Sequence, residues 1–197
     1  MPQIKTQPNY LSLGMPNLPM TAGIPLQMPG GAVANWLDQR LHLQHGPIDL
    51  IISADGATDV VINAYMRAAS VFDGLLATLV EELPILRAPA NASSPPNLEG
   101  LVARRMDEAI RPHLPRYESS DFITPMIAVA GSVADCILYA MGSGLDRAIV
   151  NNGGDIALHL SKEAFFDIGI ADDRDVYLSN FIKKSSGKLV SNMPLKG

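Results

Sequence analysis

Cysteine is almost absent from this chain, since Cys136 is the only one among 197 residues. A single cysteine excludes an intrachain disulfide framework and any zinc or iron–sulfur site built on several thiolates. The basic-then-apolar layout of a signal peptide is also missing, because Lys5 is the only charged residue before Asp38. We therefore expect a cytoplasmic protein.

Positive charge, aromatic residues and long apolar runs are also scarce. The chain carries 15 Lys and Arg against 20 Asp and Glu, a formal net charge of −5, and only 6% of its residues are aromatic. No broad basic surface is available to neutralise phosphates, so we expect no nucleic-acid partner. No apolar run reaches the ~18 residues that a membrane-spanning helix needs, so we expect no membrane partner either.

What is present suits one packed domain, because 47% of the residues are apolar. Prolines interrupt every periodic pattern in residues 1–36, which predicts a loose extension or upstream sequence outside the functional domain. The domain itself is expected at residues 37–171. Four of the six lysines follow Asp172, where apolar periodicity fades, so residues 172–197 are interpreted as an atypical lysine-rich tail.

Within the domain the apolar pattern changes between the periods of strands and helices. Residues 40–52 predict a β-hairpin, and residues 58–82 predict one long helix. Asn97 is expected to cap the next helix, which ends before Pro112. The other predicted elements are a strand or extended segment at 122–130, a helix at 133–141, and short strands at 148–150, 156–160 and 165–170.

The segment Asn151-Asn152-Gly153-Gly154-Asp155 carries the most informative local pattern. Two adjacent glycines allow positive φ angles and a close backbone approach, and successive N–H groups can form an anion nest beside Asp155. A hairpin turn with Asn-Gly at its centre explains the same residues. Both interpretations, ligand site and turn, stay open at this point.

A second candidate segment begins at Thr124 and includes Ser132 and Asp135. The i, i+3 spacing puts Ser132 and Asp135 on one face of the expected helix. A hydroxyl and a carboxylate on a mostly apolar helix can bind a ribose or an amine. They can equally cap and solvate the helix.

Other polar residues are expected to be structural. Cys136 lies in an apolar helix with no base nearby in the sequence, so we expect it to be buried and inert. His42 and His45 would lie on opposite faces of a strand and could not bind one metal ion together. Arg104 and Glu108 are expected to pair on a solvated helix face.

Read in order, four segments resemble the uncharacterised ApbE-related family of bacteria and archaea, over about residues 40–171. The four segments are RLHLQHGPIDL at 40–50, VARRM at 102–106, TPMIAVAGSVAD at 124–135 and VNNGGDIAL at 150–158. That family is similar to the ApbE flavin transferases, of which it is a distant branch. The transferases move FMN from FAD to a threonine of a target protein with Mg²⁺. The resemblance implies an α+β, T-fold-like ApbE-type domain with an antiparallel sheet and packed helices.

The resemblance also implies a site for a nucleotide-type small molecule such as FAD. It aligns residues 151–155 with the transferases' Asn-Leu-Gly-Gly-Asp segment near the flavin nucleotide. It aligns Asp135 with an aspartate that can contact the adenosine part. The residues expected to bind the cofactor are Thr124, Ser132, Asp135, Asn151, Asn152, Gly153, Gly154 and Asp155.

The chain departs from the transferases at the groups that handle phosphate and metal. Their lysine falls at Ala130, their Gly-Gly falls at Met126-Ile127, and their Mg²⁺-binding Thr-Ser-Gly segment has no match after residue 171. Without Mg²⁺, charge on the pyrophosphate lacks its main stabiliser, so we do not expect transfer activity. An interrupted or shifted reading frame near Asp172 would explain the loss as a C-terminal truncation or alteration.

The sequence thus predicts an ApbE-related domain that binds a flavin or related nucleotide. One alternative is a non-catalytic homo-oligomeric assembly module, in which the Gly-Gly segment is only a turn and the meander pairs with another subunit. Another is a truncated, inactive relative.

Overall fold

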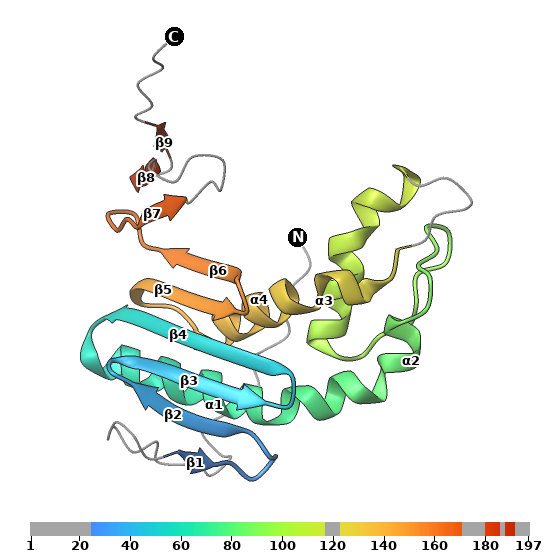
Figure 1. The fold of residues 1–197 in the computed structure, drawn as a ribbon, viewed down its shortest axis with the longest axis horizontal. Coiled ribbons are helices and arrows are strands. Elements are labelled where there is room, and N and C mark those ends of the chain that lie inside the picture. Colours follow the sequence, from blue (N-terminus) through green and yellow to red (C-terminus); the bar gives the residue numbers. More distant parts are fainter. Residues whose placement is uncertain (1–24, 117–122, 171–179, 186–187, 192–197) are drawn as a thin grey trace.

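An antiparallel sheet forms one layer of the fold and helices form the other (Figure 1). The computed structural model describes residues 25–116, 123–170, 180–185 and 188–191. Every neighbouring pair in the six-stranded sheet is antiparallel, which confirms the α+β prediction, while the T-fold-like detail stays a prediction. The strands lie in chain order: β1 (Leu26–Gln27), β2 (Val33–Leu37), β3 (Arg40–His45), β4 (Ile48–Gly56), β5 (Leu145–Asn152) and β6 (Asp155–Leu160).

Alternation of apolar side chains decides which face of the sheet is buried. Leu41 and Leu43 of β3 are fully buried, whereas Gln44 is exposed. Leu43 pairs with Leu50 of β4, so one face of the sheet presents a continuous apolar surface. The predicted hairpin at 40–52 is confirmed, and it turns at Gly46, which has a φ of 56°.

Two helices cover that apolar face: α1 (Thr58–Glu81) and α4 (Val129–Met141) (Figure 1). Phe72 of α1 and Ile137 of α4 are fully buried. Arg67 of α1 donates to the carbonyl oxygens of the last two residues of α4, Ala140 and Met141. The predicted helices at 58–82 and 133–141 are confirmed, although α4 begins four residues earlier.

In the part of the chain that the structure describes, α1 is the one helix long and apolar enough to cross a membrane. Its Tyr65 hydroxyl accepts a hydrogen bond from the Ala54 N–H at 2.9 Å, and the Tyr65 ring lies edge-on to Trp36 with centroids 5.2 Å apart. Burial raises the pKa of Tyr65. These are the contacts of a helix packed on a sheet.

The prediction of a loose extension through residue 36 is wrong for its last residues. Strands β1 and β2 lie there, and Trp36 is only 8% exposed. The carboxylate of Asp73 on α1 accepts hydrogen bonds from the backbone N–H groups of Gly30 (2.7 Å) and Ala32 (3.1 Å). Prolines therefore flank β1 and form its turn without preventing strand pairing. Residues 1–24 lie outside the described part of the chain.

Asn97 does not cap the next helix. That helix, α3, spans Leu101–Ile110, and its N-cap residue is Gly100, which has no side chain to accept hydrogen bonds from the first N–H groups of the helix. The Glu82 carboxylate, at the end of α1, accepts hydrogen bonds from the N–H groups of Glu99 (2.7 Å) and Gly100 (3.1 Å). A distant carboxylate thus replaces the local cap. The short helices α2 (Leu83–Leu86) and η2 (Arg111–Arg116) flank this region.

The strand or extended segment predicted at 122–130 is also wrong where the structure describes it, from residue 123. A 3₁₀ turn, η3 (Pro125–Ala128), leads directly into α4. Pro125 favours this geometry because its fixed φ suits the first position of a helical turn. The apolar and β-branched run at 126–129 packs as helix, so tertiary packing overrides strand propensity here.

A second, three-stranded sheet follows β6. It consists of β7 (Asp167–Ile170), β8 (Asn180–Ser185) and β9 (Lys188–Ser191). The strand predicted at 165–170 is confirmed from Asp167. Two of the three strands fall within the segment interpreted as an atypical tail, and its remaining residues lie outside the described ranges.

Candidate functional site

The two glycines of the Asn-Asn-Gly-Gly-Asp segment form the turn between β5 and β6. Gly153 and Gly154 have φ angles of 61° and 111°, as in the two-residue turns that suit twisted hairpins. Asn152 pairs with Asp155, so Gly-Gly stands at the centre in place of the predicted Asn-Gly. Asn151 Oδ1 accepts a hydrogen bond from the Gly154 N–H at 2.9 Å. The turn interpretation is confirmed, and one donor of the proposed anion nest is already in use.

The residues that flank the turn face the helix layer. Asn152 is only 9% exposed, and its Nδ2 donates to the carbonyl oxygen of Ala130 at 3.0 Å. Asp155 Oδ1 lies 3.7 Å from the position that a Cβ on Gly131 would occupy. The hairpin turn therefore lies against the first turn of α4. Two segments singled out separately in the sequence meet at this point.

A cavity of about 510 Å³ opens beside Asn152. Small-molecule sites typically enclose roughly 300–1,000 Å³ with apolar walls and a few polar groups. Among the described residues, Asn152 and Arg87 are the polar side chains on this wall, and no carboxylate lines it. The apolar lining comes from the β3–β4 turn with the start of β4, from the end of α1, and from α2, η3 and α4: Pro47, Ile48, Leu76, Leu79, Val80, Leu83, Leu86, Met126, Val129, Ala130 and Val133.

Asn152 keeps hydrogen-bonding capacity at this cavity. Its amide has two N–H groups and an acceptor oxygen. One N–H reaches Ala130, while no hydrogen bond within the described chain uses Oδ1. A donor and an acceptor on one planar amide can read an edge of a heterocyclic ring that offers the complementary pair.

Asp135 lies in a different place, on the side of α4 that faces α3. Arg105 Nε and Nη2 both donate to Asp135 Oδ2, at 3.0 and 2.7 Å, and these hydrogen bonds raise the pKa of Arg105. A cleft of about 380 Å³ surrounds the pair, lined also by Leu101, Arg104, Glu108, Cys136 and Tyr139. The Arg105 guanidinium therefore already binds the Asp135 carboxylate, which the resemblance assigns to a nucleotide.

Two other expected binding residues do not join Asn152. Ser132 is 3% exposed, so its hydroxyl shares no open face with Asp135. Thr124 is the N-cap residue of η3, and its carbonyl oxygen accepts a hydrogen bond from the Ile127 N–H at 3.2 Å. The structure thus brings together the 151–155 turn and the first turn of α4, and it separates both from Asp135.

Most of the residues that were expected to be structural make structural contacts. Cys136 is buried, which raises the pKa of its thiol to about 11. His42 pairs with Asp49 at 2.9 Å on the face of the sheet away from the helices, while His45 lies edge-on to Phe72 of α1. The two histidines therefore lie on opposite faces, as predicted.

The predicted pair of Arg104 with Glu108 is wrong for the described residues. The ion pairs of α3 join Arg105 to Asp135 and Arg111 to Asp107, the latter at 2.6 Å. Asp107 is 7% exposed, so the predicted charged face is partly turned inward. Arg111, the C-cap residue of α3, keeps helical φ and ψ angles, so its guanidinium reaches the carboxylate of Asp107 at i−4.

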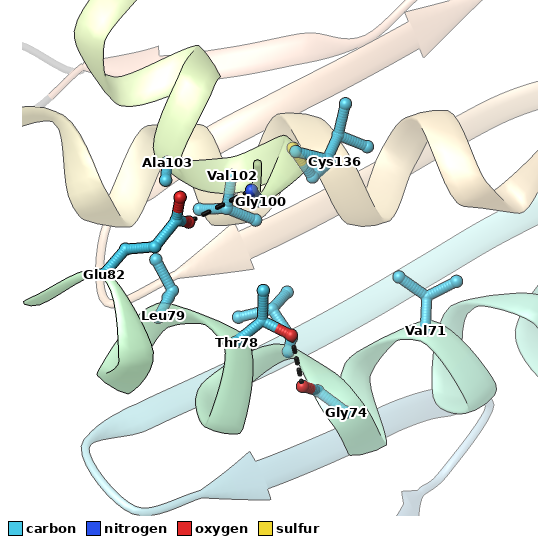
Figure 2. A pocket seen from close by; sticks show the side chains of 11 residues that line it. Val71, Gly74, Thr78, Leu79, Glu82, Gly100, Val102, Ala103 and Cys136 are labelled. Atoms are coloured by element: carbon cyan, nitrogen blue, oxygen red, sulfur yellow. Dashed lines mark hydrogen bonds between the residues drawn. The ribbon is translucent and has the colours of Figure 1, made fainter. Parts of the chain in front are cut away.

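A third cavity, of about 290 Å³, lies between α1 and α3 (Figure 2). Its polar groups are already bonded inside the protein. The Glu82 carboxylate reaches the Gly100 amide, and Thr78 Oγ1 donates to the Gly74 carbonyl at 3.3 Å. This cavity therefore offers apolar packing space with little left to orient a ligand.

FAD and Mg²⁺ make different demands on the residues of a site. The Asn152 cavity has the apolar walls and the available amide that a flavin ring would need. No group of three or more His, Cys, Asp or Glu side chains within the described ranges gathers as metal ligands would. Since Mg²⁺ prefers carboxylate oxygens, the described donors do not fit a dedicated site.

Arg87 is the residue of this site that the sequence analysis missed. It ends α2 as its C-cap residue, between the helix predicted at 58–82 and the helix that Asn97 was expected to cap. Its sequence signal is weak: a lone positive charge after the apolar run Leu83-Pro84-Ile85-Leu86. Only packing of α2 beside η3 and the 151–155 turn makes it part of a cavity wall.

Comparison with known proteins gives one family. Residues 34–189 match the family described as “AbpE bacteria”. The match begins six residues before the resembling range of about 40–171 and ends 18 residues after it, so the family pattern continues past the domain end expected at residue 171. No curated protein matches the chain. Because the matched range covers most of the chain, the protein belongs to the “AbpE bacteria” family.

Proposed function

We propose that this protein binds a flavin or a related nucleotide in the Asn152 cavity and does not transfer FMN. One observation carries the proposal: a nearly buried amide with an unused acceptor oxygen stands on the wall of an otherwise apolar cavity of about 510 Å³. The motif resemblance to ApbE-type transferases supports the choice of a flavin. The family description itself names no activity.

The hydrogen-bonding edge and the apolar surface of a flavin ring would match the groups on the wall of the Asn152 cavity. The pyrimidine edge of a flavin presents an N–H between two carbonyl groups, while the rest of the tricyclic ring is largely apolar. Asn152 Oδ1 would accept from that N–H, and the second Nδ2 hydrogen would donate to a neighbouring carbonyl. Leu76, Leu79 and Val133 would cover the apolar part of the ring.

The residues of η3 and of the first turn of α4 argue against transfer. Ala130 stands where the transferases have a lysine, and its carbonyl oxygen is engaged by Asn152. Met126 and Ile127 replace their Gly-Gly, and the Ile127 side chain is 75% exposed. No side chain here supplies the charge that a leaving pyrophosphate needs. Binding without transfer is the function that this set of residues supports.

Fluorescence titration with FAD and FMN, with and without Mg²⁺, tests the proposal. We expect saturable binding that Mg²⁺ does not change. Asn152→Ala should weaken binding at least about tenfold, because it removes both hydrogen bonds of the amide to the ring, each of which contributes about 0.5–1.5 kcal/mol. Asn151→Ala is the matched control: the neighbouring amide serves the turn and faces away from the cavity, so affinity should change less than about twofold. Circular dichroism confirms that each variant is folded.

Asp155→Asn adds a second arm to this experiment. Asp155 lies beside the first turn of α4, where its charge complements the helix N-terminus. Unchanged flavin affinity in a folded Asp155→Asn protein would leave this residue without a binding role. A wild-type chain that is folded but binds no flavin would overturn the proposed function.

A second candidate function, assembly with another subunit, rests on β6. Ile156 and Leu158 are 55% and 42% exposed, and within the described strands β6 pairs only with β5. An exposed apolar edge strand is a template for pairing with another chain. Light scattering that gives a dimer mass, reverting to a monomer in Leu158→Lys, would favour assembly.

A further inference from the structure

We infer that the Asn152 cavity selects ligands that carry a phosphate or similar anionic group, and that Arg87 is the residue that recognises it. The inference rests on the proposed function and goes one step further, because it names the part of the ligand that decides affinity. A comparison of FMN with riboflavin separates the contribution of the phosphate from that of the ring, since the two compounds share the ring and differ by one phosphate.

The first support is the charge balance of the cavity wall. The chain as a whole is acidic, with a formal net charge of −5. Yet among the described residues that line the cavity, Arg87 carries the only charge. A single guanidinium with no carboxylate among the lining residues gives this wall a local positive charge.

The second support is that Arg87 has no internal partner in the described residues. Other arginines are committed: Arg105 to Asp135, Arg111 to Asp107 and Arg147 to Asp55. Arg67 is committed as well, to the carbonyl groups at the end of α4. No ion pair or side-chain hydrogen bond of the described chain involves the Arg87 guanidinium. Its fork of N–H donors suits a phosphate in two-point contact.

The third support is the first turn of α4. Val129 and Ala130 line the same cavity, and they begin a helix of 13 residues. A helix N-terminus carries partial positive charge, which adds to the field of Arg87; Asp155 lies beside the same turn but does not line the cavity. The ring would lie against Asn152 and the apolar wall, with the phosphate toward Arg87.

Parallel titrations of the full chain with FMN and riboflavin test the inference. We expect the wild type to bind FMN about tenfold more tightly than riboflavin, with a ratio that falls as NaCl is raised. Arg87→Gln should bring FMN affinity down to that of riboflavin and leave riboflavin affinity unchanged. Arg87→Lys should keep part of the preference, since charge remains but the two-point contact is lost.

Arg104→Gln is the matched control. Arg104 is likewise exposed and has no ion pair in the described residues, but it lines the α3/α4 cleft instead. Its loss should leave both affinities unchanged. Equal affinity of the wild type for the two flavins, or an unchanged ratio in Arg87→Gln, would overturn this inference alone. Absence of binding of either flavin to the folded chain would overturn the proposed function and this inference together.

Discussion

Two polar side chains at successive turns of α4, Asn152 packed against the first turn and Asp135 on the next, differ in whether a protein group already uses their hydrogen-bonding capacity. Beside the first turn, Asn152 donates one hydrogen bond to Ala130 and keeps its amide oxygen for a cavity. One turn later along α4, the Asp135 carboxylate accepts two hydrogen bonds from the Arg105 guanidinium. Both side chains lie at the same helix, and the resemblance assigned both residues to a ligand site. The difference lies in what the neighbouring element supplies.

This difference separates a group that can bind a ligand from one that holds two helices together. The Arg105–Asp135 pair joins α3 to α4 across an exposed cleft, where an ion pair contributes little and is screened by salt. Asn152 lies in an apolar environment, where each hydrogen bond counts for more. The site is therefore assigned to the Asn152 side, and the following substitutions test that assignment.

The largest contrast is expected between Asn152→Leu and Asp135→Leu. Asn152→Leu removes the bond that ties the hairpin turn to α4 and should lower the free energy of unfolding by about 1–2 kcal/mol. Asp135→Leu breaks a pair whose members are 43% and 52% exposed, so its cost should lie within about 0–1 kcal/mol. Urea denaturation measures both. A larger loss for Asp135→Leu would reverse the comparison.

A smaller effect of opposite sign is expected from Gly131→Ala. Glycine inside a helix is less favourable than alanine by roughly 0.5–1 kcal/mol. The nearest atom to the added Cβ would be Asp155 Oδ1 at 3.7 Å, an ordinary contact. The substitution should therefore raise the midpoint of thermal unfolding. Destabilisation would mean that the 151–155 turn packs closer to α4 than described here. Gly142→Ala provides the contrast, because its φ of 81° and an Arg67 atom at 2.8 Å make alanine strained there.

Local patterns predicted the parts of the fold that depend on neighbours in sequence. The hairpin at 40–52, the helix α1 and the Gly-Gly turn follow from alternation, helical spacing and the conformational freedom of glycine. The predictions failed where a distant side chain completes the structure. Asp73 fixes the chain before β2, and Glu82 caps α3. Neither partner is close enough in sequence to leave a local pattern.

The candidate site likewise has one part that local sequence patterns predicted and another part that they did not. The 151–155 segment stood out because two glycines between asparagines and an aspartate are rare outside turns and ligand sites. Arg87 and the apolar wall did not, because the cavity is assembled from five separate elements and the residues around Gly46. Asp135 was assigned to a ligand because its partner, Arg105, lies 30 residues away and pairs only once α3 packs on α4.

The smallest effect concerns the chemistry of Cys136 beside the Arg105–Asp135 pair. Burial raises the pKa of this thiol to about 11 from 9.0, with Asp135 adding to the increase and Arg105 opposing it. Two pKa units mean about 100-fold less thiolate below pH 9, so alkylation of the native protein should be at least that much slower than in urea.

Because the raised pKa belongs to the folded state, its contribution to stability is complete below pH 9 and is lost as the pH rises towards about 11. Asp135→Asn should lower the thiol pKa and speed alkylation, whereas Arg105→Gln should do the reverse. Alkylation rates measured by mass spectrometry between pH 7 and 10 show whether each substitution raises or lowers the pKa of the thiol. Equal rates in both variants would mean that the pair does not act on the thiol, and that burial alone sets its reactivity.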